Sequence, residues 1–141
     1  MGKGADIISA ARSIDEENAR AAPVFISGAT GPKAAFINGY FLPTEEKGVD
    51  GRVLYSKSGD GSIVIEHFEG KWQVKNVSDK STAACMASVA GGCALAGCDS
   101  RVWRVNDGKA WGDQACVKMA TGADAELQVS DASACKRTMA I

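Results

Sequence analysis

Glycine turns between short alternating segments constrain this chain more than any other feature. Asn38-Gly39, Asp50-Gly51, Glu69-Gly70 and Asp107-Gly108 separate the runs that carry most of the aromatic residues. Asn-Gly and Asp-Gly tolerate the positive φ angles that tight hairpin turns demand. Short runs separated by such turns are typical of a β meander, in which each strand pairs with the next. The sequence therefore predicts a mainly β fold.

The clearest hairpin joins residues 63–68 to residues 71–77 through the turn Glu69-Gly70. Successive side chains of a strand point to opposite faces of the sheet. Trp72 and Val74 therefore share one face of the second run, and we expect that face to be buried. The other face carries Lys71, Gln73 and Lys75. We expect it to be a solvated outer face, with Arg52, Lys57 and Arg104 as neighbouring basic residues.

Several other runs have the composition or alternation of strands. They are Val24–Ser27, Ala35–Phe41 with a turn or bulge at Asn38-Gly39, Arg52–Lys57, Arg101–Asn106, Ala110-Trp111, Val117–Ala120 and Leu127–Ser130. A surface loop is predicted at Pro43–Gly48. Residues 81–98 are nearly all small, and Cys85–Val89 fits a buried strand or a short helix equally well.

Two segments far apart in the sequence resemble each other. Val24–Ala29 and Val117–Ala123 both run from a strand through small residues to a glycine. One interpretation is that they form neighbouring strands that close a barrel.

The domain plan is simple. A helix is predicted within residues 1–22, because Ile7, Ala10, Ala11 and Ile14 form one apolar stripe at helical spacing. Residues 23–130 form the β domain, and residues 131–141 form a C-terminal tail. The expected fold is a small barrel or a two-sheet sandwich of antiparallel hairpins, with one N-terminal α-helix.

Composition excludes several classes of function. The formal net charge is −1, which argues against broad electrostatic binding to nucleic acid or to anionic lipid. No apolar run approaches the roughly 20 residues of a membrane span. The first residues lack the apolar core of a secretory signal, and the five cysteines are an odd number without zinc-type spacing. We therefore expect a cytoplasmic protein with reduced thiols, no metal site and no membrane or nucleic-acid partner.

Two motifs resemble parts of enzyme sites. Residues 26–31 look like the start of a dinucleotide fingerprint, but such a site needs a helix directly afterwards, and Ala34–Phe41 reads as a strand. No cofactor is therefore predicted. Glu66 and His67 are adjacent, so on a strand they point to opposite faces and form no catalytic pair by themselves. No catalytic residue is assigned.

The aromatic residues are the best candidates for ligand contacts. Trp72 and Trp103 fit core positions, whereas Trp111 follows a turn and is the best candidate for an exposed ring. An exposed tryptophan beside polar groups can stack on a sugar, a peptide or a base. The candidate ligand-binding residues are Trp111, Tyr40, Tyr55 and His67.

One stretch of motifs resembles a known module. It runs from Ile37-Asn38-Gly39-Tyr40 through residues 70–75, Gly-Lys-Trp-Gln-Val-Lys, to Trp103-Arg104-Val105 and Asp107-Gly108. This pattern, across roughly residues 24–125, resembles a β-rich module of unknown function found in uncharacterised protist proteins, including trypanosomatid hypothetical proteins. The resemblance implies binding or scaffolding rather than catalysis and brings no catalytic residues.

Together these observations favour a non-enzymatic interaction or scaffolding module. Its partner would be a protein or a small polar ligand, bound through loops and exposed aromatic side chains. The alternative is a small enzyme that uses His67 with a cysteine or carboxylate partner. A monomer and a homodimer are both compatible with the sequence.

Overall fold

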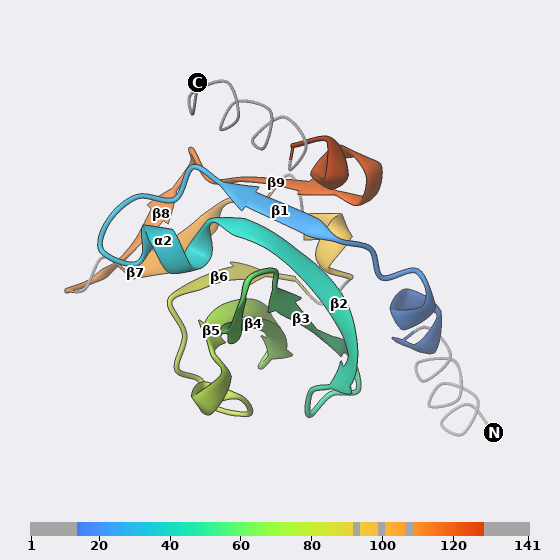
Figure 1. Ribbon diagram of the computed structural model, residues 1–141. Helices are drawn as coiled ribbons and strands as arrows, with labels where there is room; N and C mark the ends of the chain where they lie inside the picture. Colours follow the sequence, from blue (N-terminus) through green and yellow to red (C-terminus); the bar gives the residue numbers. More distant parts are fainter. Residues whose placement is uncertain (1–13, 92–93, 99–100, 107–108, 129–141) are drawn as a thin grey trace.

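The computed structural model describes residues 14–91, 94–98, 101–106 and 109–128. Nine strands form one antiparallel sheet in the order β8-β7-β6-β5-β4-β3-β2-β1-β9. Figure 1 shows this sheet curling around an interior as a half-barrel. The mainly β prediction is confirmed, and the strands belong to a single curled sheet rather than to two stacked sheets. The strands are β1 (Val24–Ser27), β2 (Gly39–Lys47), β3 (Val53–Lys57), β4 (Asp60–Phe68), β5 (Lys71–Asn76), β6 (Ala87–Ala90), β7 (Trp103–Asn106), β8 (Trp111–Gln114) and β9 (Lys118–Thr121).

The pairing of β1 with β9 curls the sheet. Val24 lies opposite Thr121 and Ser27 lies opposite Lys118. The interpretation of the two similar segments as neighbouring strands is therefore confirmed. A three-residue connection, 115–117, links β9 to β8 at the opposite end of the strand order. Because this connection is so short, the two edge strands of the sheet approach each other at that point.

Short helical elements complete the described chain. They are α2 (Ala34–Ile37), the 3-10 helices η1 (Val77–Asp79) and η2 (Leu95–Cys98), and residues 14–19 and 122–128. Residues 14–19 belong to the helix predicted at the N-terminus. They dock on the turn before β3, because the amide of Asn18 donates to Gly51 O at 2.9 Å and accepts from Val53 N at 3.1 Å. Residues 1–13 and the predicted tail, 131–141, lie outside the described residues.

Four details of the predicted strands were wrong or incomplete. Residues 34–37 form α2, so the strand expected at Ala35 begins only at Gly39. The predicted loop at residues 43–48 is mostly the second half of β2. Residues 127–128 are helical, and the ambiguous segment around residue 87 is the strand β6.

Pro43 misled the interpretation of β2. Proline has no N–H for a ladder and is tolerated where a strand is unpaired on one side. β1 pairs with β2 only as far as Phe41, and beyond that point only β3 accompanies β2, with Pro43 opposite Tyr55. The register shifts between Pro43 and Lys47, and Figure 1 shows β2 bending strongly along its length. The bend helps the sheet to curl.

The helix α2 does not restore the dinucleotide fingerprint. A Rossmann unit places its helix between two parallel strands. Here β1 and β2 are antiparallel neighbours, and α2 has only four residues. Gly28 before it has a φ of +85° and lies against Cys116 O, where a side chain would collide. Gly28 therefore serves a tight backbone approach between β1 and the segment before β9.

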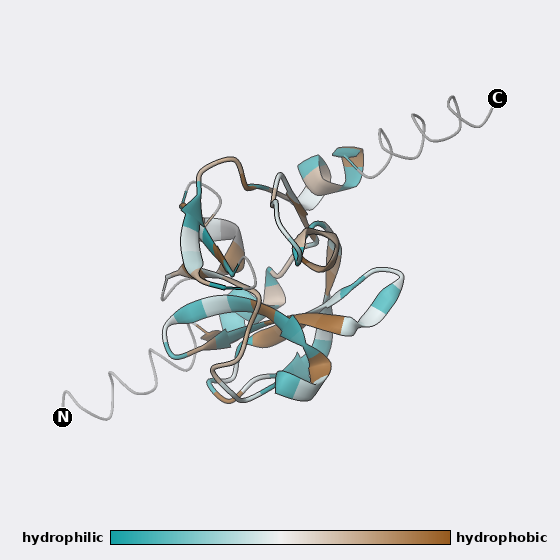
Figure 2. Ribbon diagram, turned by 90° about the vertical axis from the view of Figure 1, so that its left-hand side faces the viewer, coloured by the Kyte–Doolittle hydropathy of each residue, from teal (hydrophilic) through white to brown (hydrophobic). Residues whose placement is uncertain are grey.

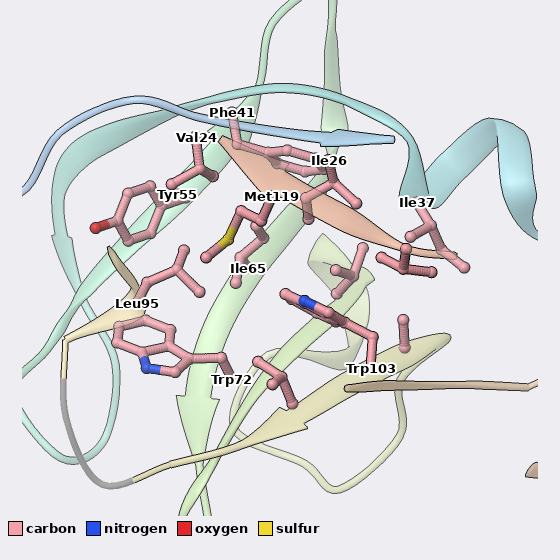
Figure 3. Close-up of a cluster of buried hydrophobic side chains, with 14 of the residues drawn as sticks. Val24, Ile26, Ile37, Phe41, Tyr55, Ile65, Trp72, Leu95, Trp103 and Met119 are labelled. Carbon is pink, nitrogen blue, oxygen red and sulfur yellow. The ribbon is translucent and has the colours of Figure 1, made fainter. Parts of the chain in front are cut away.

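The core fills the concave side of the sheet. Figure 3 shows side chains from β1, β2, β3, β4, β5, β7 and β9 converging there, together with Ile37 and Leu95. Trp72 and Trp103 are 2% and 1% exposed, which confirms both as core residues. Along the strands, hydrophobic and hydrophilic stretches both occur (Figure 2), as expected for a sheet with one face packed on a core.

The convex face of β4 and β5 is also covered, which the sequence analysis did not expect. Gln73 is 4% exposed and Lys75 is 0% exposed, so the prediction of a solvated face was wrong for both. The segment 77–86 lies over them: Lys75 Nζ donates to Thr82 O at 2.7 Å, and Ser81 N donates to the carboxylate of Glu66 at 2.9 Å. Alternation along a strand shows which residues share a face, but not whether another segment covers that face.

Candidate functional site

A row of polar side chains crosses the convex face of four consecutive strands. Gln73 on β5 lies opposite Ser88 on β6, Ser88 lies opposite Arg104 on β7, and Arg104 lies opposite Asp113 on β8. Directly paired residues project to the same side of a sheet. The row therefore places an amide, a hydroxyl, a guanidinium and a carboxylate side by side on a continuous platform.

A pocket of about 200 Å³ lies over this row. Its floor is made of two buried polar residues, Gln73 and Ser88, which are 4% and 7% exposed. One wall comes from the segment 77–86. The remaining lining residues lie on β5, β7 and β8 and in the turn before β5. The lining residues are Glu69, Lys71, Gln73, Ala83, Cys85, Ser88, Arg104 and Trp111.

The floor carries an unpartnered hydrogen-bond acceptor. Oε1 of Gln73 is buried and has no hydrogen-bond partner. Among the buried side-chain nitrogen and oxygen atoms of the described residues, the only other one without a partner is Nε1 of Trp103 in the core. Leaving a buried polar atom unsatisfied costs roughly 1–3 kcal/mol. Gln73 lines the pocket through its other atoms, because Oε1 itself has almost no solvent-accessible surface.

The charged lining residues are predominantly basic. Lys71 and Arg104 contribute positive charge, and Glu69 is the one acidic residue of the lining. Arg104 Nε lies 3.6 Å from Oδ1 of Asp113, with both side chains more than half exposed. Such exposed pairs contribute little and are easily rearranged, so the guanidinium remains free to bind an anion. The local balance is thus positive on a chain whose net charge is −1.

Cys85 also lines the pocket but is poorly suited to act as a nucleophile. Burial raises the pKa of its thiol, and this outweighs the opposite influence of Lys75 and Lys71. A cysteine nucleophile reacts as the thiolate. At neutral pH the Cys85 side chain is therefore a small neutral wall of the pocket.

Trp111 is the predicted ligand-binding residue that lies in this pocket. It is 39% exposed at the start of β8, as its position after a predicted turn indicated. The structure does not bring the other three to it. Tyr40 is half-buried on β2 opposite Phe25, and Tyr55 and His67 are both buried against Trp72 in the interior.

Tyr55 contributes to a different hollow. It lines a space of about 360 Å³ beside residues 16–22 and Ala94. Its ring packs edge-on against Trp72 with centroids 5.9 Å apart, and burial raises its pKa to about 12. The phenol therefore stays protonated across the physiological range and offers a hydroxyl rather than a charge.

His67 is held by two acceptors. Its Nδ1 lies 2.5 Å from Oδ2 of Asp50, and its Nε2 lies 2.7 Å from the carbonyl oxygen of Gly91. A carbonyl only accepts, so Nε2 carries a proton, and Nδ1 faces a carboxylate. Arg52 binds the same carboxylate and also pairs with Glu17 of the N-terminal helix. This chain of hydrogen bonds and ion pairs ties that helix, the β2–β3 turn and β4 together.

This network lowers the pKa of the Asp50 carboxyl group. Burial alone would raise the pKa of its carboxyl group, but hydrogen bonds from Arg52 and His67 outweigh burial and hold the pKa below its ordinary value. His67 does therefore have a carboxylate partner. Its second nitrogen, however, is occupied by backbone rather than directed at a nucleophile or a cavity.

Sequence reasoning missed the pocket because it treated Gln73 as solvated. The hairpin register contained a usable signal. A two-residue turn at Glu69-Gly70 fixes Phe68 opposite Lys71 and Glu66 opposite Gln73, as observed. This register puts Glu66, Gln73 and Lys75 on one face, and such a mixture of opposite charges and an amide is compatible with burial under a further segment.

Comparisons of the chain with protein-family models, curated proteins and solved structures gave no match. The resemblance to the protist β-rich module therefore stays a prediction. Within the described ranges, no cluster of three or more His, Cys, Asp or Glu side chains is placed to hold a metal ion. No described helix combines the length and the apolar character needed to cross a membrane.

Proposed function

We propose that this protein is a non-catalytic binding module that holds a small polar ligand in the pocket between the segment 77–86 and β8. The observation that carries the proposal is a pocket whose floor is formed by two buried polar residues, Gln73 and Ser88, and whose lining includes the exposed Trp111. Ligand sites in proteins combine a few well-placed polar groups with aromatic surface, and this pocket has both.

The platform favours binding without rearrangement. The floor residues lie on β5 and β6, which pair directly, and their backbones are fixed by the ladder. Sites built on paired strands are held more rigidly than sites on loops, so a ligand loses less affinity to ordering the protein. The volume of about 200 Å³ lies below the usual range of roughly 300–1,000 Å³ for drug-sized ligands. A single-ring molecule suits it better than an extended chain.

Binding is favoured over the enzymatic alternative by the state of the candidate nucleophile and base. Cys85 in the pocket is a neutral thiol, and both ring nitrogens of His67 are engaged away from the pocket. General base catalysis requires an imidazole nitrogen within reach of the proton to be removed. Neither residue meets the requirements of its role.

We also infer a reducing compartment such as the cytoplasm for this module. Cys85, Cys98 and Cys116 are free thiols in the described part of the chain. Disulfides form and persist in oxidising compartments and are rare where thiols are kept reduced. Mass spectrometry tests this inference after the purified protein has been unfolded and alkylated without any reductant. Quantitative modification of all five cysteines after unfolding without reductant supports it, and a retained disulfide contradicts it.

Ligand binding is tested by a fragment screen read out by ¹H–¹⁵N NMR on the full chain. We expect small polar rings to shift the signals of Lys71, Gln73, Ser88 and Trp111 and to leave those of β1 and β9 unchanged. Gln73→Leu and Trp111→Leu should each abolish the shifts. Gln128→Leu, an exposed glutamine at a distant position, is the matched control and should preserve them. Shifts confined to other surfaces, or no shifts at all, would refute the proposal.

A further inference from the structure

The outer edge of β8 is the sheet edge best suited to pair with another strand. We propose that two copies of this chain associate through this edge, with β8 of one copy antiparallel to β8 of the partner subunit and Gly112 at the two-fold axis. The inference is independent of the ligand proposed above, because it concerns the backbone of β8 and not the floor of the pocket.

The register of the sheet identifies the backbone groups on this edge. Asn106 N donates to the carbonyl oxygen of Met86, just before β6, so Asn106 and Arg104 both direct their backbone groups toward β6. Their partners on β8, Trp111 and Asp113, therefore form non-hydrogen-bonded pairs with β7 and direct N–H and C=O outward. Because β8 pairs with β7 alone among the described strands, this edge offers two donors and two acceptors.

These groups lie on the surface. Trp111, Gly112 and Asp113 are all exposed, and a Cβ added to Gly112 would meet nothing within 4 Å. Figure 1 shows β7 and β8 at the margin of the sheet. At the end of the strand, the side-chain amide of Gln114 exchanges hydrogen bonds of 3.0 and 3.2 Å with the backbone of Thr30. This contact holds β8 in place, so its edge is already ordered for pairing.

The other open edges of the sheet are protected. Beyond its contact with β1, β2 is paired on one side only, but this stretch carries Pro43 and the charged residues 45–47. Proline and charged side chains are features by which proteins prevent pairing at an edge. The helical segment after β9 flanks that strand, since its Leu127 lines one hollow together with Lys118 and Met119. β8 contains no proline and has no helix directly after it.

A second β8 complements this edge in one register. When Gly112 lies opposite Gly112 of the partner subunit, Trp111 lies opposite Asp113 of the partner subunit and exchanges both hydrogen bonds with it. The two-fold axis repeats this pair, so all four outward groups of each copy are satisfied. The two glycines form the central non-hydrogen-bonded pair, in which the Cα atoms approach to roughly 4.5 Å.

The side chains are compatible with this register. Trp111 and Asp113 project to the same convex face as Arg104, which lies opposite Asp113 on β7. In the dimer each Asp113 therefore lies between Arg104 of its own chain and Trp111 of the partner subunit. A register that placed Asp113 opposite Asp113 of the partner subunit would bring two carboxylates together, which is destabilising. The Gly112 register pairs both outward residues of the strand and opposes no like charges.

Sedimentation velocity on the full chain under reducing conditions tests the association. We expect the weight-average mass to rise with protein concentration from 14.6 kDa toward twice that value. Concentrations up to about 1 mM are needed, because a dimer with a dissociation constant near that value is still substantially populated there. A mass that stays at that of the monomer over the whole range overturns the proposal.

Two substitutions of Asp113 separate edge pairing from side-chain effects. Asp113→Pro and Asp113→Ala both remove the carboxylate, but only proline removes the outward N–H, which takes no part in the β7–β8 ladder. Asp113→Pro should raise the dimer dissociation constant at least about tenfold, because each dimer loses two intermolecular hydrogen bonds. Asp113→Ala should stay within about threefold of the parent protein, since the lost ion pair is exposed. Equal dimerisation of the two variants overturns the proposal.

Disulfide formation tests the register without relying on the folding of Asp113→Pro. A Cα separation of roughly 4.5 Å lies within the range for a disulfide. Gly112→Cys, with the native cysteines retained, should therefore form a link between the two copies of residue 112 on mild oxidation, identified by peptide mass spectrometry. Asp113→Cys is the matched control, because residue 113 faces residue 111 of the partner subunit. Absence of the residue-112 link in dimeric protein, or equal linking at residue 113, overturns the proposal.

Discussion

Lys75 on β5 places its Nζ 2.8 Å from Oε1 of Glu66 on β4, and the two side chains are 0% and 1% exposed. The ammonium also donates to Thr82 O at 2.7 Å and lies 5.2 Å from the ring centroid of Phe68. The carboxylate in turn accepts from Ser81 N, a residue with a φ of +64°. This buried pair therefore fastens the segment 77–86, and with it one wall of the pocket, to the sheet.

Removing one partner of this pair should be far more damaging than removing both. Lys75→Met leaves the Glu66 carboxylate buried without its cation, which costs about 3–5 kcal/mol of unfolding free energy. The double variant Lys75→Met with Glu66→Met should recover at least half of that loss. Urea denaturation measures both.

The exposed pair Lys80–Glu46 supplies the control for this comparison. Its side chains are 29% and 56% exposed, so Lys80→Met should cost less than about 1 kcal/mol. If Lys75→Met were no more destabilising than Lys80→Met, the buried pair would not fasten the segment.

Asp50 should make stability sensitive to acid. Its folded-state pKa lies below the ordinary value of 3.8, because hydrogen bonds from Arg52 and His67 outweigh burial. A depressed carboxyl pKa adds stability that is complete above the unfolded pKa and is lost as the pH falls through the folded pKa. The part of the parent protein's advantage over Asp50→Asn that comes from this carboxylate should therefore be complete above about pH 5 and shrink below about pH 4.

Urea midpoints measured at each pH test this dependence. Glu45→Gln, which changes an exposed carboxylate on β2, is the control and should follow the parent curve. A difference between the parent protein and Asp50→Asn that stays constant down to pH 2.5 would contradict the assigned pKa direction.

Trp111 should account for nearly all quenchable tryptophan fluorescence. Of the three tryptophans in the chain, Trp72 and Trp103 are at most 2% exposed, whereas Trp111 is 39% exposed. Iodide should quench one class of emission in the parent protein and almost none in Trp111→Phe. Substantial quenching that survives in Trp111→Phe would show that the interior is open to solvent, in conflict with the packing of the two core indoles.

Gly28 should be much less replaceable than Gly59. Both have positive φ, +85° and +82°, so alanine at either costs roughly 1–2 kcal/mol in backbone energy. At Gly28 an added Cβ would lie 2.1 Å from Cys116 O, whereas at Gly59 nothing lies within 4 Å. Gly28→Ala should therefore lower the thermal midpoint distinctly more than Gly59→Ala. Equal effects would show that the approach of the β8–β9 connection to β1 is not tight.

The sequence was informative wherever one local signal determined the outcome. The turn Glu69-Gly70 and its flanking alternation gave the β4–β5 hairpin, and the similar segments at Val24 and Val117 gave the β1–β9 pair. Trp111 was correctly identified as exposed from its place after the predicted turn Asp107-Gly108, which itself lies outside the described residues. These features depend on residues close in sequence, or on two segments that resemble each other.

The other parts of the fold and of the candidate site depend on contacts between segments that are far apart in the sequence, and no local sequence pattern indicates such contacts. Pro43 is accommodated in β2 because β1 stops short of it, which is a property of the neighbouring strand. Gln73 and Lys75 are buried because the segment 77–86 returns over them, held by Glu66. Tyr55 and His67 were predicted as ligand-binding residues from their residue type. In the structure, their rings pack on Trp72 instead.

The position of β9 beside β1 has a consequence for synthesis on the ribosome. Domains begin to fold as the chain emerges, starting from the N-terminal side. The outer edge of β1 has no partner until residues 118–121 have been translated, although every other neighbour in the sheet is already available. A nascent chain halted before that point carries an open, apolar strand edge, so ribosome stalling late in the message should yield aggregating fragments while release after β9 should not.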